Sequence, residues 1–167
     1  MTKGTRVLDE KQVAQKIRRI AFEVYENNYS EKKLFIAGIE GGGYHLAELI
    51  KNELDVISPI ETSLLMIKLD KTSPTRGEIE IEGDINKLKN HVLLLVDDVQ
   101  NTGRTFMYGV RPFLNIRVKK IEVAVLVNRD HVQFPVIPTY TGYELSTTMD
   151  DHIHVSLKKG EASVYLY

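Results

Sequence analysis

The sequence predicts an α/β fold with a mostly parallel central sheet flanked by helices. Short apolar segments of strand length alternate along the chain with longer segments of helical periodicity. One segment, residues 92–96, is an unbroken run of Val and Leu, which is typical of a strand buried on both faces of a parallel sheet. Parallel neighbours require crossover connections, and these are almost always right-handed.

The first helix is expected to begin after Asp9 and to end near residues 27–28. Asp9 can accept a hydrogen bond from the first turn, and Gln12 completes a variant of the capping box. Apolar residues then recur at helical spacing on one face: Val13, Ile17, Ile20, Ala21 and Val24.

The next elements are a strand, a glycine loop and a second helix. Residues 34–39 are apolar and short enough for a buried strand. The loop at 40–43 follows, and a helical pattern then runs from 44 to about 54. Residues 60–69 are expected to form a further strand.

The second half of the chain continues this alternation. Residues 70–77 have loop composition, and Ile79 and Ile81 alternate with glutamates as in a half-exposed strand. A helix is expected from about residue 106, which Pro112 should kink or shorten. A buried strand at 121–127 precedes a tail of short strands and turns.

The composition sets limits on the class of protein. A chain of 167 residues has the size of one domain, so we expect a single domain over residues 1–167. The absence of cysteine excludes disulfides and thiolate sites. Without a membrane-length apolar run or a signal-peptide core, the expected location is the cytoplasm. The net charge of −1 argues against a generic nucleic-acid binder and leaves room for a local basic patch.

Polar residues follow three of the predicted strands. They lie at 40–43, 97–105 and 128–131. Because ligands of open α/β sheets bind beyond the carboxyl ends of the strands, these segments would meet in one crevice if their strands are neighbours.

The segment VLLLVDDVQNTGRT, residues 92–105, carries the most specific signal. Its turn should lead into a helix N-terminus, where free backbone N–H groups, Thr102, Thr105 and the close approach allowed by Gly103 favour a phosphate. The adjacent Asp97 and Asp98 suit the hydroxyls of a diol or a hydrated divalent cation. Together they indicate a ribose 5-phosphate, although an acid pair can also simply cap a turn. The Walker A and G-x-G-x-x-G motifs are absent.

This segment resembles the phosphoribosyl diphosphate binding motif of the type I phosphoribosyltransferases. Within that family the chain is most similar to the pyrimidine operon regulators that also act as uracil phosphoribosyltransferases. Further stretches that carry the likeness are residues 7–10, 38–43 and 124–131, with Pro135. The resemblance implies the type I fold with a small hood, formed partly by the segment at about 130–167.

The resemblance also implies the roles of individual residues. Asp97, Asp98 and Asn101 would be the catalytic residues, with the two acids binding the ribose hydroxyls. Magnesium would be the cofactor, chelated mainly by the substrate, so that no protein metal ligand is expected. The substrate-binding residues would be Glu40, Gly41, Gly42 and Gly43 at the pyrophosphate; Lys71 and Arg76 on a mobile loop at 70–77; Val99, Gln100, Thr102, Gly103, Arg104 and Thr105 in the motif; and Asn128 and Arg129 near the base.

The activity implied by the resemblance is transfer of a nucleobase, with uracil as the first candidate, to phosphoribosyl diphosphate, with release of pyrophosphate. A homodimer or higher homo-oligomer would be expected. The loop at 40–43 lacks the basic residues usual in the regulators, and Asn101 stands where purine-using relatives carry an aspartate. Two alternatives therefore stay open: a pyrimidine-responsive RNA-binding attenuation regulator, with RNA the less favoured partner of a mildly acidic chain, and a non-catalytic sensor of phosphoribosyl diphosphate or nucleotides.

Overall fold

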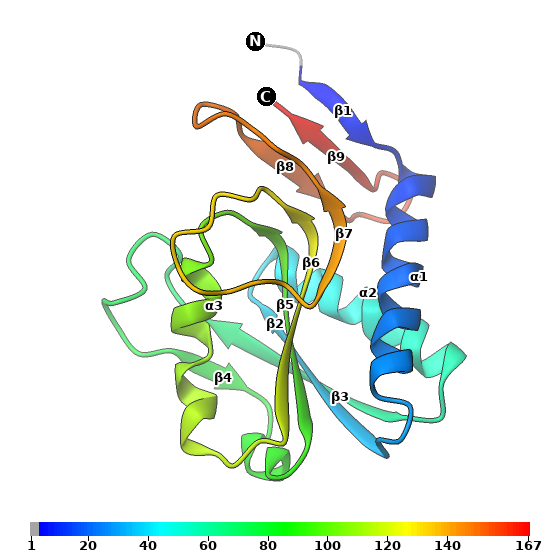
Figure 1. The fold of residues 1–167 in the computed structure, drawn as a ribbon, viewed down its shortest axis with the longest axis vertical. Helices are drawn as coiled ribbons and strands as arrows, with labels where there is room; N and C mark the ends of the chain where they lie inside the picture. Colours follow the sequence, from blue (N-terminus) through cyan, green and yellow to red (C-terminus); the bar gives the residue numbers. More distant parts are fainter. Residues whose placement is uncertain (1–3) are drawn as a thin grey trace.

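The computed structural model describes residues 4–167 and contains two sheets (Figure 1). The larger sheet has the order β4-β3-β2-β5-β6-β7. All neighbours in it are parallel except β4, which pairs antiparallel with β3. The prediction of an α/β fold with a mostly parallel sheet is confirmed. Its strands are β2 (Lys33–Ile39), β3 (Glu61–Lys68), β4 (Glu80–Glu82), β5 (Val92–Gln100), β6 (Lys120–Asn128) and β7 (Tyr140–Glu144).

A second, three-stranded antiparallel sheet forms the hood sheet, in the order β1-β9-β8. It joins the two ends of the described chain: β1 (Thr5–Leu8), β8 (Ile153–Ser156) and β9 (Ser163–Leu166). The sequence did not predict β1, because four residues that pair with a strand at the opposite end of the chain carry no local signal. Of the tail, β7 joins the main sheet through β6, whereas β8 and β9 belong to the hood sheet.

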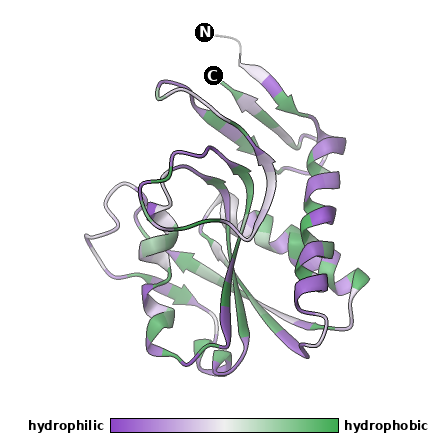
Figure 2. Cartoon of the chain, viewed as in Figure 1, coloured by the Kyte–Doolittle hydropathy of each residue, from purple (hydrophilic) through white to green (hydrophobic). Residues whose placement is uncertain are grey.

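Helices cover both faces of the main sheet. Alternate residues of each central strand enter different cores, as the two-residue period of a strand requires. Leu94 and Val96 pack with α1 (Glu10–Asn27) and α2 (Gly42–Ile57). Leu93 and Leu95 pack with residues of α3 (Arg104–Gly109) and of the 3₁₀ helix at Arg111–Asn115. Figure 2 shows the central strands as largely hydrophobic and much of α1 as hydrophilic.

The predicted helix signals are confirmed at α1. Asp9 accepts a hydrogen bond from the Gln12 backbone N–H at 2.9 Å, and the Gln12 side chain accepts one from the Asp9 backbone N–H. The predicted shortening near Pro112 is also confirmed, since α3 ends at Gly109 and the chain continues as a 3₁₀ helix. The second helix is longer than predicted and starts inside the glycine loop, at Gly42.

Strand β5 is also longer than predicted, and this changes the setting of the acid pair. The strand continues to Gln100, so Asp97 and Asp98 lie within it and not after its end. Pairing with β2 stops at Val96, whereas pairing with β6 continues through Asp97 to Gln100. Beyond Val96, β5 therefore no longer pairs with β2, and the glycine loop packs against β5 on that side.

Candidate functional site

The three strands with polar ends are neighbours, because β2, β5 and β6 are adjacent in the main sheet. Since they run parallel, their carboxyl ends lie at the same edge. A cavity of about 290 Å³ lies at this edge and is called the motif cavity below. It is lined by Lys71, Asp97 and every residue from Val99 to Phe106. The segment singled out in the sequence thus forms most of one cavity.

The glycine loop packs directly against the two acids. A Cβ on Gly43 would lie 2.8 Å from both Asp97 Oδ1 and the Val96 carbonyl oxygen, and one on Gly42 would overlap Asp98 Oδ2. Gly41 caps α2 with a φ of 93°, a conformation that only glycine adopts without strain. The close contacts with the acids explain Gly42 and Gly43, and the left-handed backbone conformation explains Gly41.

The two adjacent acids have different surroundings. Asp97 is 2% exposed, and Lys71 Nζ lies 3.0 Å from both of its carboxylate oxygens. Burial raises the pKa of Asp97 to about 7, with a further upward contribution from the charge of Asp98 and an opposing one from Lys71. Asp98 is only partly buried, and its Oδ1 accepts the Val99 backbone N–H. Asp98 therefore has the more exposed carboxylate, and Asp97 is the member of the pair whose protonation changes near neutral pH.

The turn after β5 is held by the segment that follows β6. The Thr102 carbonyl oxygen accepts the backbone N–H groups of Gln133 and Phe134, each at 3.0 Å. Gly103 adopts a left-handed conformation, φ 85°, as the N-cap of α3. Gln100 donates to the Val136 carbonyl oxygen, and its own Oε1 is buried without a hydrogen-bond partner among residues 4–167. This bracing fixes the backbone of the turn.

Arg129 and Asn128 do not line the motif cavity. Arg129, for which the resemblance implied substrate binding, is 9% exposed as a residue, and its guanidinium donates to protein oxygens, including Asn101 Oδ1 at 2.9 Å. Asn128 lines a separate cavity of about 630 Å³ between the end of β6 and β7, together with Ile137 and Glu144. Asn128 is the last residue of β6, one residue beyond the predicted end of the strand, and Arg129 follows it. The substrate-binding roles implied for both stay predictions.

Asp98, Glu40, Arg76 and the three loop glycines do not line the motif cavity either. Glu40 is exposed, and its backbone N–H donates to the Ile67 carbonyl oxygen at 2.9 Å, which extends the ladder between β2 and β3. Arg76 is exposed on the 70–77 loop. Of that loop only Lys71 reaches the motif cavity. The sequence showed basic residues in this loop, but only the fold could show that one of them bonds to Asp97.

A magnesium ion would find few protein ligands here. Within the described part of the chain, no group of three or more His, Asp or Glu side chains is arranged to hold a metal. Magnesium needs about six oxygen ligands and usually keeps several waters. The partly exposed carboxylate of Asp98 fits such a hydrated ion if the substrate supplies the other oxygens, so the residues are compatible with a substrate-borne cation.

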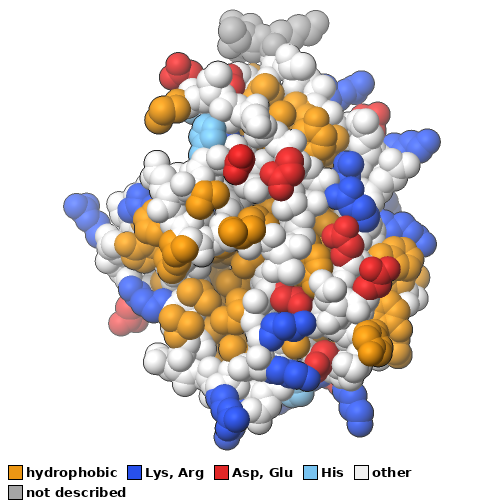
Figure 3. Space-filling model, viewed as in Figure 1, with side chains coloured by type: hydrophobic (Ala, Val, Ile, Leu, Met, Phe, Trp, Pro, Cys, Tyr) orange, Lys and Arg blue, Asp and Glu red, His pale blue; other side chains and the backbone are white. Residues whose placement is uncertain are grey.

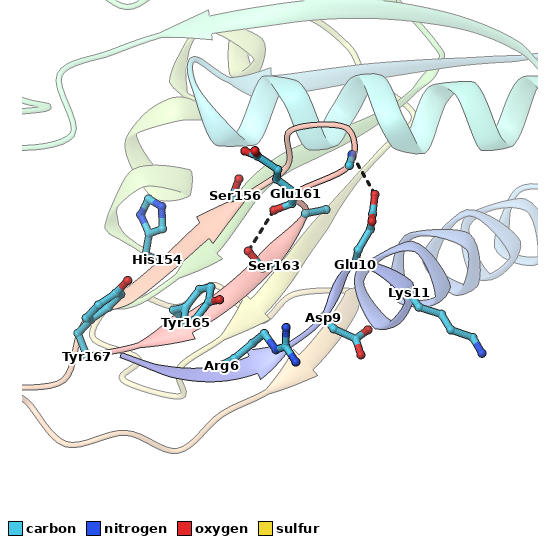
Figure 4. Close-up of a pocket in the computed structure, with 12 residues that line it drawn as sticks. Arg6, Asp9, Glu10, Lys11, His154, Ser156, Glu161, Ser163, Tyr165 and Tyr167 are labelled. Carbon is cyan, nitrogen blue, oxygen red and sulfur yellow. Dashed lines mark hydrogen bonds between the residues drawn. The ribbon is translucent and has the colours of Figure 1, made fainter. Parts of the chain in front are cut away.

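A larger cavity of about 740 Å³ lies on the hood sheet, away from the motif (Figure 4). Arg6 of β1, His154 of β8 and Tyr165 of β9 line this cavity together with Tyr167, which follows β9 (Figure 4). The carboxylate of Glu10 accepts the Gly160 backbone N–H at the far side. None of the predicted site residues lines this cavity, so the motif cavity remains the candidate functional site.

The chain is similar in sequence to a known protein family and to named relatives. The family model described as "Phosphoribosyl transferase domain" matches residues 3–158. The protein named "Bifunctional protein PyrR" from Clostridioides difficile is 32% identical over an alignment 174 positions long that spans 98% of each chain. The protein of the same name from Caldicellulosiruptor bescii is 30% identical over an alignment 165 positions long that spans 93% of this chain and 89% of that one.

Two solved structures share the fold at low sequence identity. The hypoxanthine phosphoribosyltransferase of Trypanosoma cruzi superposes with a TM-score of 0.77 at 11% identity, over 97% of this chain and 95% of that one. A hypoxanthine-guanine phosphoribosyltransferase from Bacillus anthracis gives 0.75 at 14% identity, over 98% of both chains. None of the helices in residues 4–167 is long and apolar enough to cross a membrane.

Proposed function

The chain belongs to the phosphoribosyltransferase family, and on that premise we propose that it joins a nucleobase, with uracil as the first candidate, to phosphoribosyl diphosphate. The observation that carries the proposal is the motif cavity. One continuous segment from Val99 to Phe106 lines it beside a buried acid and a lysine. The relatives named PyrR support a pyrimidine as the base, as does the likeness of the sequence to pyrimidine regulators.

The motif cavity fits a ribose 5-phosphate. The turn around Thr102 and Gly103 offers backbone N–H groups and hydroxyls to a phosphate. Asp98, and Asp97 once Lys71 has moved away, accept hydrogen bonds from the ribose hydroxyls. The Lys71 side chain is 44% exposed on its loop, and its ammonium supplies the positive charge that the glycine loop lacks. Phosphate and diol recognition are thus separated along one strand and its turn.

The reaction requires a ring nitrogen of the base to form a bond to the anomeric carbon of the ribose. The bond from that carbon to pyrophosphate breaks, and pyrophosphate leaves with the electron pair. The protein positions the two reactants and stabilises developing charge, and no covalent nucleophile is needed. Magnesium, when bound with the substrate, neutralises charge on the pyrophosphate. Closure of the 70–77 loop over the substrate, with Lys71 turned from Asp97 toward the pyrophosphate, excludes water from the reactive sugar.

The decisive assay offers phosphoribosyl diphosphate and magnesium with uracil, hypoxanthine, guanine, xanthine, adenine or orotate, and scores release of pyrophosphate. We expect turnover with uracil. The double variant Asp97→Asn, Asp98→Asn should lose turnover and stay folded, because both changes preserve shape. Glu26→Gln, at an exposed position of α1, is the matched control and should keep full activity. Absence of turnover with every base would exclude the enzyme, and full activity of the double variant would exclude the assigned site.

A regulatory RNA-binding role is the second candidate, favoured by the word "bifunctional" in the names of the relatives. Acidic and basic side chains are interspersed on the face drawn in Figure 3, so that face is not a continuous basic surface. RNA binding through phosphate contacts weakens steeply as salt rises. Salt-dependent binding of RNA that responds to a pyrimidine nucleotide would support this role. Failure to bind RNA at low salt would exclude the role.

A further inference from the structure

The Arg129 guanidinium connects three segments of the chain at the edge of the site. It donates to Thr147 Oγ1 at 2.9 Å, to the carbonyl oxygens of Thr148 and Asp151 at 3.1 and 2.8 Å, and to Asn101 Oδ1 at 2.9 Å. The side chain comes from the residue that follows β6 and is only 9% exposed. A buried planar cation with this many directed bonds has one orientation, so it fixes the groups that it contacts.

The contact with Asn101 determines the orientation of the Asn101 amide. A guanidinium has only hydrogen-bond donors, so the group that faces it must be the amide oxygen and not the NH₂. The NH₂ of Asn101 therefore points away from Arg129. Asn101 is exposed and lines the motif cavity. Its two N–H donors have no hydrogen-bond partner within residues 4–167, in contrast to its oxygen.

We propose that Arg129 is a positioning residue that holds Asn101 with its amide N–H groups toward the motif cavity, where they bind an acceptor oxygen of the ligand. This inference rests on the proposed function, because it takes a phosphoribosyl compound as the ligand. The acceptor belongs either to the phosphate or to a carbonyl group of the nucleobase. In both cases Asn101 donates, so the site rejects a ligand that presents an N–H at this point.

The substitution Asn101→Asp tests the orientation directly. It leaves an oxygen for Arg129 and replaces the NH₂ with a second oxygen, so the fold is kept and a donor becomes a charged acceptor. We expect the ligand whose acceptor oxygen contacts Asn101 to bind roughly 10- to 100-fold more weakly, as when a hydrogen bond is replaced by an unpaired polar contact. Asn52→Asp, on the exposed surface of α2, adds the same charge outside the motif cavity and should leave binding unchanged.

Calorimetric titration with ribose 5-phosphate and with uridine 5′-monophosphate distinguishes the two sources of the acceptor. Loss of affinity for both ligands assigns the acceptor to the phosphate, and loss for the nucleotide alone assigns it to the base carbonyl. Unchanged affinity for both in Asn101→Asp overturns the inference. If the unchanged protein binds neither ligand, the proposed function fails as well. If it binds them without turnover, only the enzyme assignment fails.

The role of Arg129 needs a readout that a purely structural contact would not change. Arg129→Lys keeps the charge but cannot make the same set of directed bonds. We expect it to weaken the same ligand as Asn101→Asp and to have no additional effect in the Asn101→Ala background, where no amide remains to be oriented. Equal, additive losses in both backgrounds would contradict a positioning role. If Arg129→Lys does not fold, Asn101→Asp still decides the orientation.

Discussion

Asp97 is the residue whose chemistry differs most from that of a surface acid. Its pKa, raised by burial to about 7, lies well above the value of about 3.9 that an aspartate has in an unfolded chain. The native state therefore binds more protons than the unfolded state between about pH 4 and pH 7. The contribution of Asp97 to stability is full below pH 4 and is lost as the pH rises through 7.

The substitution Asp97→Asn should remove this pH dependence. Each pKa unit corresponds to about 1.4 kcal/mol. From pH 4 to pH 8 the protein with Asp97 should therefore lose up to about 4 kcal/mol of unfolding free energy relative to the Asp97→Asn variant. Urea unfolding at several pH values measures it. Asp70→Asn is the control, because hydrogen bonds from Thr72 and Ser73 lower the pKa of Asp70 and it cannot produce the same trend. An unchanged difference across this range would show that Asp97 titrates normally.

Single residues in the site were predicted to very different degrees. The segment from Asp97 to Thr105 was recognisable because its residue types match one ligand chemistry in one continuous stretch. The bonds of Lys71 to Asp97 and of Arg129 to Asn101 join residues 26 and 28 positions apart, which no local pattern encodes. The sequence predicts a ribose phosphate site here, whereas only the fold shows that Asp97 is buried and Asp98 is partly exposed.

At the scale of elements, the junction of β2 and α2 positions the acids. The two glycines that touch them have different neighbours. A Cβ on Gly43 would meet the Val96 carbonyl oxygen and the Asp97 Cα at 2.8 and 3.0 Å, which are backbone atoms of the central strand. A Cβ on Gly42 would meet the Asp98 carboxylate, which can rotate away. The first contact would displace the backbone of β5 and destabilise the fold. The second would displace only the Asp98 carboxylate and so change the geometry of the site.

The substitutions Gly43→Ala and Gly42→Ala should therefore separate stability from binding. Gly43→Ala should lower the free energy of unfolding by about 1–3 kcal/mol, as overpacking in a core does. Gly42→Ala should change stability less and should weaken binding of ribose 5-phosphate, because Asp98 is displaced. Chemical unfolding and calorimetry measure the two effects. Similar losses of stability in both variants would contradict the view that Gly43 packs on the backbone of β5 and Gly42 only on the Asp98 side chain.

Element boundaries show why the sequence predicts the start of α1 and misses β1. The start of α1 depends on Asp9 and Gln12, which lie within one turn, so the sequence was sufficient. The pairing of β1 with β9 joins Thr5 to Leu166 and depends on the completed fold. The extension of β5 beyond Val96 likewise depends on β6 as a partner, because two acids are poor strand formers by themselves.

At the scale of the whole molecule, the hood sheet and the main sheet share one apolar core. Leu8 of β1 and Val164 of β9 belong to the same buried cluster as Leu34 of β2 and Leu94 of β5. A hood that packed on a core of its own could open independently of the main sheet. With a shared core, opening the hood would expose residues that also support α1 and the central strands, so we expect residues 4–167 to unfold as one unit, as most domains of this size do.

The substitution Leu8→Ala tests this coupling from the hood side. Leu8 is 2% exposed, so its truncation should cost about 2–5 kcal/mol of unfolding free energy. Because the core is shared, hydrogen exchange of the β5 amides should accelerate as much as exchange of the β9 amides, although β5 lies in the other sheet. Val56→Ala, at a side chain that is 80% exposed at the end of α2, is the matched control and should leave both rates nearly unchanged. Faster exchange confined to β1, β8 and β9 would show a hood that opens on its own.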